Sequence, residues 1–184
     1  MKNIFTLLLV LMTLSIFSQD RIPVEMANSQ FSINILSPSL TYEKGLNENQ
    51  SLYLSLGFEG LSRTNENNDG KIGVAPVIEA TYRNYYPRKK VKKELRPNSG
   101  NYVGLSAGYI MNSIADNLED FDQPFKEESA FFLGPVWGIQ RNYKSGIHLG
   151  LSLGGGFITG KNTNFDFNFI GNFELGFVIN TKSK

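Results

Sequence analysis

The residues best suited to chemistry are the single histidine, His148, and Ser152, four positions further along the chain. A serine nucleophile needs a base within hydrogen-bond reach and a third group that orients the base. The residues around this pair alternate in polarity, which predicts a strand, and positions i and i+4 of a strand lie about 13 Å apart at ~3.3 Å per residue. The two side chains cannot touch within one strand. We therefore interpret His148 as structural and expect no catalytic residue and no enzymatic activity.

Two further segments have part of the pattern of a ligand-binding loop. The glycine-rich stretch "GLSLGGGFITG" is not followed by a helix whose N-terminus could hold a phosphate. The stretch "RTNENNDGK" has Asn65, Asn67, Asp69 and Gly70 at calcium-loop spacing, but Pro76 stands at the twelfth position, where a bidentate acid is required. The chain has no cysteine, which excludes thiolate metal sites and disulfides. We expect neither a cofactor nor a bound metal.

The start of the chain predicts export. Residues 1–18 have the layout of a secretory signal peptide, with Lys2, an apolar run and a final small residue, Ser18. Residues 19–184 then form one domain. The chain has 18 Lys and Arg against 17 Asp and Glu, and the signal segment contributes only Lys2 to this difference. Balanced charge gives no general attraction to nucleic acid, so we expect no nucleic-acid partner.

Apolar and polar residues alternate throughout the remaining chain, between spacers rich in Asn, Asp, Gly, Pro and Ser. The first run changes phase near Pro38, where either a bulge continues one strand or a tight turn divides it into two. Closed bacterial barrels have an even number of strands. We therefore predict an all-β fold, a single antiparallel up-and-down barrel of eight strands, with the eighth at this phase change or just upstream at residues 22–26. The seven clear runs are 30–44, 51–60, 72–86, 101–111, 130–141, 147–160 and 165–180.

The two faces of these strands differ in composition. One face is an unbroken row of Leu and Phe, and the other is mostly Gly, Ser, Asn and Tyr with few charges. Small residues allow tight curvature around a narrow interior, so we place the polar face inside and the apolar face against lipid, which makes the barrel transmembrane. Arg83 is then the centre of an internal ion-pair network that takes its partners from the inward acids. The residues predicted for this network are Arg83, Glu79, Glu59 and Glu174, with Glu43 and Asp166 as further inward acids, and those predicted for aromatic girdles are Tyr82, Trp137 and Tyr109.

The spacers strengthen the membrane interpretation. Short connections at 45–50 and 142–146 alternate with longer polar ones at 61–71 and 112–129, as in barrels with short periplasmic turns and longer external loops, although 87–99 is long for its place. With the signal segment and the motifs "LSPSLTYEKGL", "GNYVGLSAGY", "GPVWGIQRNY" and "FELGFVIN", the chain resembles the small outer-membrane β-barrel proteins of Gram-negative bacteria, the OmpA-, OmpX- and OmpW-like barrels.

This resemblance implies a location in the cell outer membrane, contact with its lipid and lipopolysaccharide, and insertion by the barrel-assembly machinery. It also implies that the last strand carries an assembly signal, which Glu174, Gly176, Phe177 and Ile179 match, although the chain continues through "NTKSK" instead of ending on an aromatic residue.

Two charged segments are candidates for contacts outside the barrel. The acidic stretch "ADNLEDFDQPFKEES" could hold divalent ions that bridge lipopolysaccharide phosphates, and the basic stretch "PRKKVKKELRP" could contact anionic headgroups. In each case an ordinary solvated loop is the simpler interpretation. The sequence thus predicts an integral outer-membrane barrel with a structural or surface-interaction role and an unidentified external ligand. The alternatives are a soluble periplasmic lipocalin-like barrel with its apolar face around an apolar ligand, and a narrow pore, for which eight strands leave little room. An enzyme that acts on lipid A or phospholipid ranks behind the structural barrel and the soluble carrier.

Overall fold

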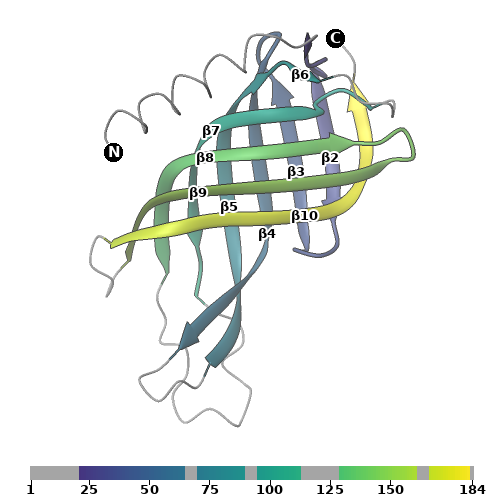
Figure 1. Ribbon diagram of the computed structural model, residues 1–184. Coiled ribbons are helices and arrows are strands. Elements are labelled where there is room, and N and C mark those ends of the chain that lie inside the picture. The colour runs from purple at the N-terminus through teal and green to yellow at the C-terminus, as the bar shows by residue number, and fades with distance from the viewer. Residues whose placement is uncertain (1–20, 65–69, 90–94, 113–128, 161–165, 183–184) are drawn as a thin grey trace, which may run out of the picture.

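The computed structural model describes residues 21–64, 70–89, 95–112, 129–160 and 166–182. Eight antiparallel strands close one up-and-down barrel, in which consecutive strands are neighbours and β10 pairs with β2 (Figure 1). The predicted all-β, eight-stranded barrel is confirmed. No helix in these ranges is long and apolar enough to cross a membrane. The barrel strands are β2 (Ser29–Asn34), β3 (Ser39–Gly45), β4 (Gln50–Thr64), β5 (Gly70–Tyr86), β7 (Gly100–Ile110), β8 (Ala130–Asn142), β9 (Ile147–Gly160) and β10 (Asp166–Lys182).

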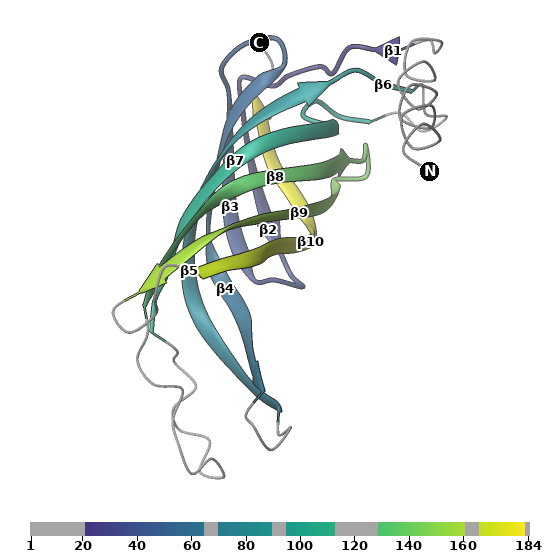
Figure 2. The same cartoon turned by 60° about the vertical axis from the view of Figure 1, so that its left-hand side comes forward.

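The eighth strand comes from the phase change near Pro38. Residues 35–38 form a tight turn, so the first run is divided into β2 and β3, which pair from Ser29 with Lys44 to Asn34 with Ser39. A turn reverses the chain and restarts the alternation, which explains the change from odd to even apolar positions. The upstream alternative is wrong, since Arg21–Ile22 form a short strand, β1, that pairs with β6 (Arg88–Lys89) outside the barrel (Figure 2).

The predicted division of the faces is also confirmed. Polar and small residues, with a few large ones such as Tyr53, Tyr85 and Phe132, point into the closed barrel, and most large apolar residues point out. On β9, for example, His148 is 1% exposed, whereas Leu153 and Phe157 are 40% and 46% exposed. The pairing of β9 with β10 places outward residues opposite one another, Leu149 with Leu175 and Phe157 with Phe167. The outer surface of the barrel is therefore built from cross-strand pairs of apolar side chains.

The two ends of the barrel differ. What we call the turn end carries the connections 46–49 and 143–146, residues 95–99 and the last residues of β10, toward the top and right of Figure 1. The opposite end, the loop end, carries the turn 35–38 and the other connections. The connection between β4 and β5 is shorter than predicted, because these strands run to Thr64 and from Gly70. Residues 65–69, 113–128 and 161–165 lie outside the described ranges.

Two segments outside the barrel strands close the turn end. Val24 and Met26 pack against the inward rings of Tyr85 and Tyr102, and Val136 completes this apolar cluster. Residues 95–99 hold the N-terminal segment in place: the amide of Asn98 donates to the carbonyl of Glu25 at 2.8 Å, and the Asn98 side-chain oxygen accepts from the amide of Ala27 at 2.8 Å. Residues 95–99 and the N-terminal segment thus form a lid on the barrel interior.

The loop end is less complete, because the β2–β3 hairpin is short. β2 and β3 have 6 and 7 residues, whereas β4 and β5 have 15 and 17, and the hairpin stops well above their lower ends (Figure 1). β10 pairs with β2 only from Gly176 onward, and β4 pairs with β3 only as far as Gly57. Beyond the turn 35–38, β10 and β4 therefore each have a strand neighbour on one side only.

Candidate functional site

The interior of the turn half is filled by a hydrogen-bonded network of side chains, and His148 lies within it. The Nδ1 atom of His148 is 2.6 Å from Oδ1 of Asn142, and Nε2 is 3.0 Å from Oε2 of Glu174. Asn142 donates through Nδ2 to the carbonyls of Pro97 and Asn98, which leaves its Oδ1 as the acceptor that faces the imidazole. Both ring nitrogens thus face oxygen acceptors, one from an amide and one from the Glu174 carboxylate.

Glu174 is bound from three strands. Besides His148 on β9, Tyr53 on β4 donates its hydroxyl to Oε1, and Asn172 donates its amide to the same oxygen at 3.1 Å. The glycine opposite makes room for this carboxylate, because a Cβ at Gly150 would lie 2.5 Å from Oε2. A buried carboxylate with several donors is stable where an unpaired one would be costly. The glycines of the interior row therefore provide space for larger side chains.

Arg83 lies at the centre of the network between two aromatic rings. Its guanidinium carbon is 3.5 Å from the ring centre of Tyr53 and 4.5 Å from that of Tyr102, the range of cation–π contact. Its Nη1 donates to Oε1 of Gln140 at 2.7 Å and lies 3.9 Å from Oε1 of Glu43. Among the described residues, Arg83 is the only buried Lys or Arg.

Glu43 is the acid that pairs with Arg83, and it links the network to the lid. Its Oε1 accepts from the hydroxyls of Ser51 at 2.6 Å and Tyr85 at 2.8 Å. Its Oε2 accepts from the amides of Gln140 at 2.8 Å and Asn98 at 3.2 Å. Asn98 also accepts a hydrogen bond from the amide of Ala27. Its side chain therefore connects the charged network of the interior to the N-terminal segment.

The four residues predicted for the Arg83 network all face the interior, but they separate into two groups. Glu174 joins Arg83 through Tyr53, which bonds the carboxylate and stacks on the guanidinium. Glu79 and Glu59 form no ion pair with Arg83 among the described residues, and Glu43 takes that place. Glu79 instead accepts from Thr81 at 2.8 Å and Ser106 at 2.6 Å, nearer the loop end.

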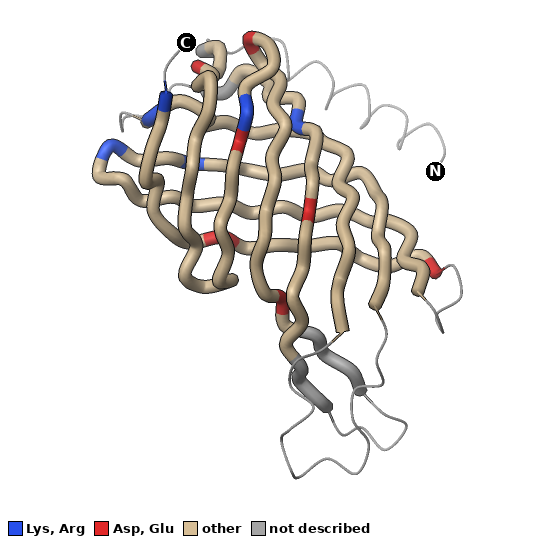
Figure 3. Tube along the Cα trace, turned by 180° about the vertical axis from the view of Figure 1, so that it is seen from behind, with Lys and Arg blue, Asp and Glu red and all other residues tan. Residues whose placement is uncertain are grey.

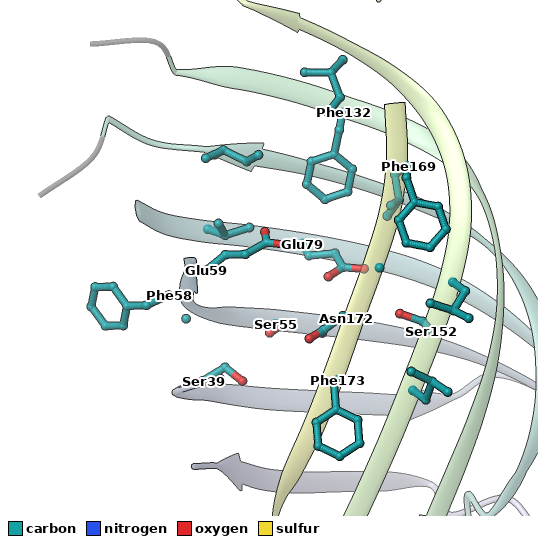
Figure 4. A pocket seen from close by; sticks show the side chains of 18 residues that line it. Ser39, Ser55, Phe58, Glu59, Glu79, Phe132, Ser152, Phe169, Asn172 and Phe173 are labelled. Atoms are coloured by element: carbon teal, nitrogen blue, oxygen red, sulfur yellow. The ribbon is translucent and has the colours of Figure 1, made fainter. Parts of the chain in front are cut away.

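Glu59 and Glu79 line a cavity of about 440 Å³ at the loop end. Ser55, Ser152 and Asn172 extend its polar wall, and the rings of Phe58, Phe169 and Phe173 form part of its rim (Figure 4). Ser152 therefore lines this cavity, whereas both nitrogens of His148 are bound to Asn142 and Glu174 in the network.

Comparisons with known proteins identify no relative of this chain. No family model, no characterised protein and no solved structure matches it. The resemblance to the small outer-membrane barrels, and everything it implies, therefore stays a prediction. In the predicted assembly signal, Glu174 and Gly176 are buried inside, whereas Phe177 and Ile179 are 51% and 61% exposed outside.

Sequence reasoning missed several members of the network. The inward positions of Tyr53, Tyr85, Tyr102 and Gln140 follow from the alternation, but nothing in the sequence says which of them meet across the barrel. Asn98 lies in a segment that looked like an ordinary charged turn, and its left-handed backbone, with φ of 57°, carried no recognisable signal.

The other predicted ligand segments give no site in the described structure. The calcium-loop residues Asn65, Asn67 and Asp69, the acidic stretch from 115 to 128, residues 90–94 of the basic stretch, and the signal segment lie outside the described ranges. Within those ranges, no group of three or more His, Cys, Asp or Glu could hold a metal ion.

Proposed function

We propose that the chain is an integral barrel of the bacterial outer membrane with a structural or surface-interaction role. The observation that carries this proposal is the outer face of the barrel, on which large apolar side chains are exposed on every barrel strand. No charged residue occupies an outward position in the stretches 52–58 of β4, 74–82 of β5, 103–109 of β7, 131–139 of β8, 149–157 of β9 and 167–179 of β10.

Energetics favour lipid as the solvent of this face. Soluble monomers rarely expose contiguous apolar patches larger than a few hundred Å². Leaving one large apolar side chain in water instead of burying it forfeits about 1.5 to 3 kcal/mol. Phe31 and Ile33 on β2, Leu54 and Leu56 on β4, and Val103 and Leu105 on β7 are each at least 40% exposed. A belt of such residues around a closed sheet suits acyl chains.

The distribution of polar groups supports one orientation. Lys and Arg lie mostly at the turn end, and the middle of the barrel has few charged positions (Figure 3). On the outer face, Trp137 donates its indole N–H to the hydroxyl of Tyr86 at 2.7 Å, an arrangement that suits an aromatic girdle. Outer-membrane barrels have short periplasmic turns, so we place the turn end in the periplasm.

The filled interior supports a structural role over the two alternatives. Tyr53, Tyr85, Gln140 and His148 are almost completely buried inside the turn half, and residues 23–28 and 95–99 cover them. Such an interior leaves no room for a water-filled path. A lipocalin-like carrier needs a large enclosed apolar cavity, whereas the turn half of this barrel is filled by side chains that are mainly polar or charged.

Fractionation tests this proposal. The full chain, expressed in a Gram-negative host, is expected in the outer-membrane fraction, resistant to extraction with sodium carbonate at alkaline pH and released only by detergent. Its migration on an electrophoresis gel should shift on boiling, as folded barrels do. Recovery of the folded protein in the soluble periplasmic extract without detergent would overturn the proposal.

A further inference from the structure

The wall of the barrel has an opening at the loop end, between β10 and β4. The turn 35–38 marks its upper edge: the amide of Ile35 donates to the carbonyl of Leu175 at 2.7 Å, and the amide of Phe58 donates to the carbonyl of Pro38 at 3.0 Å. Beyond these bonds, no described strand lies between the two edges. Neighbouring strands of a sheet lie ~4.8 Å apart, and the positions of two strands are vacant here, so the backbones of β10 and β4 are about 14 Å apart across the opening.

This opening lies within the apolar belt. A strand that crosses a bilayer needs about 9 to 11 residues, so β2 and β3, with 6 and 7, are too short to cross. Phe173 borders the opening, and its partner across the sheet, Leu151, belongs to the outward row of β9. In a membrane, the opening would thus face acyl chains, in the half of the bilayer nearer the loop end.

The cavity described above lies directly behind this opening. Its volume of about 440 Å³ falls in the range of small-molecule sites, roughly 300 to 1,000 Å³. Its inner lining combines polar side chains, among them Glu79 and Ser55, with the buried apolar side chains of Val77 and Phe132. At the two edges, Phe58, Phe169 and Phe173 are 45%, 71% and 46% exposed (Figure 4). A cavity with both polar and apolar lining and an apolar lateral exit fits an amphiphile.

The charges of the cavity indicate the sign of the headgroup. In the turn half, Glu43 faces Arg83 and Glu174 faces His148, so each interior acid has a basic partner. In the cavity, Glu59 and Glu79 have no ion-pair partner among the described residues, although Glu79 accepts two hydroxyl hydrogen bonds. Two uncompensated carboxylates in one cavity attract a cation and disfavour an anion.

We propose that this cavity binds a single-chain amphiphile with a primary-amine headgroup. The ammonium group lies between Glu59 and Glu79, where it can donate to both carboxylates and to Ser55. The acyl chain leaves through the opening between β10 and β4 and enters the membrane past Phe169 and Phe173. This site rests on the proposed membrane location, because the acyl chain of the ligand leaves the cavity into lipid.

The test measures binding of dodecylamine by isothermal titration calorimetry, with the folded full-length protein in maltoside micelles. We expect one saturable site for dodecylamine and none for dodecanoate, which has a similar chain and an anionic headgroup. Glu59→Gln with Glu79→Gln keeps the size of both side chains and should weaken binding at least tenfold. Glu48→Gln, an exposed acid in the connection 46–49 at the turn end, is the matched control and should bind as the wild type does.

A second variant tests the lateral exit. Ser39, the first residue of β3, lines the cavity at the upper edge of the opening and is half-buried. Ser39→Trp should therefore weaken dodecylamine binding while binding of butylamine, which has no long chain to pass through the opening, stays as in the wild type. Gel migration before and after boiling verifies that each variant is folded, and the single variant Glu59→Gln replaces the double variant if that one does not fold.

Three results would overturn the site: equal binding of dodecanoate and dodecylamine, wild-type affinity in the glutamine variant, or no saturable binding. Fractionation keeps this conclusion separate from the proposed function. A protein found in the membrane that binds no amine refutes the site alone. Soluble protein that still binds the amine refutes the membrane location and the lateral exit, and leaves only the acidic cavity.

Discussion

Arg83 is a buried cation at the centre of the interior network. It is 3% exposed and balances Glu43. Removing one partner of a buried ion pair leaves an unpaired charge and typically costs about 3 to 5 kcal/mol. Arg83→Met should therefore lower the midpoint of urea unfolding in detergent, whereas Lys182→Met, which removes an exposed cation, should not. Adding Glu43→Gln to Arg83→Met should recover part of the loss. An Arg83→Met barrel that unfolds at the wild-type midpoint would mean that water solvates the interior acids.

Asn98 tests how the lid is fastened to the barrel. Its φ of 57° is tolerated by Asn and Gly, but costs most other residues about 1 to 2 kcal/mol. Asn98→Gly loses only the side-chain hydrogen bonds to Ala27 and Glu43, whereas Asn98→Ala also strains the backbone. We expect both variants to lower the unfolding midpoint, with Ala the lower, and to accelerate hydrogen exchange at the Ala27 amide. Unchanged exchange in both would show that the lid is held by its apolar contacts and by the backbone bond from Asn98 to Glu25.

At the scale of the strands, the apolar belt yields a matched pair of substitutions. Leu105 lies in the middle of β7 and is 50% exposed, and Leu46 lies in the connection 46–49 and is 48% exposed. A cation on the lipid face at the midplane of a barrel costs about 2 to 4 kcal/mol, and little near the interface. Leu105→Arg should reduce the fraction folded into lipid vesicles, measured by gel migration before and after boiling, whereas Leu46→Arg should not. Equal effects of the two substitutions would show that the side chain of Leu105 does not face the lipid midplane.

The alternation of residue types was sufficient to predict the strands and their faces, because a period of two is a local property of the chain. It located the change of phase at Pro38, but a bulge and a turn give the same local pattern, and pairing with β10 and β4 decides between them. The shortness of the β2–β3 hairpin follows from the same turn. The opening beside it could not be predicted, because it depends on how far β4 and β10 extend beyond their neighbours.

The contacts between side chains inside the barrel were harder to predict from the sequence than the strands. Alternation places Glu43, Glu79 and Arg83 on one face, yet the partner of Arg83 depends on how the strands are staggered around the barrel. Glu79 lies four residues from Arg83 on β5, and the guanidinium is instead directed across the interior to Gln140 and Glu43. Asn98 was unpredictable for a different reason, since it reaches the interior from a connection and has no strand periodicity.

For the whole molecule, the filled turn half predicts the absence of conduction. The side chains around Arg83 and the segment that contains Val24 and Met26 occlude the same end of the barrel. Folded protein reconstituted into planar bilayers should therefore produce no stable ion-conducting steps, with gel migration verifying that the inserted sample is folded. Reproducible steps from the folded wild type would favour the narrow pore over the structural barrel.

The seam between β2 and β10 joins the first barrel strand to be synthesised to the last. Contacts between distant parts of a sequence carry a large loop-closure cost and slow folding. The last strand also contains Glu174, whose carboxylate is hydrogen-bonded to Tyr53 and His148. A nascent chain without β10 therefore has an unpaired edge on β2 and an interior whose tyrosine and histidine lack their shared acceptor. Intermediates with unpaired strand edges and exposed interior groups are prone to aggregate, so the folding of this barrel is complete only when its last strand has paired.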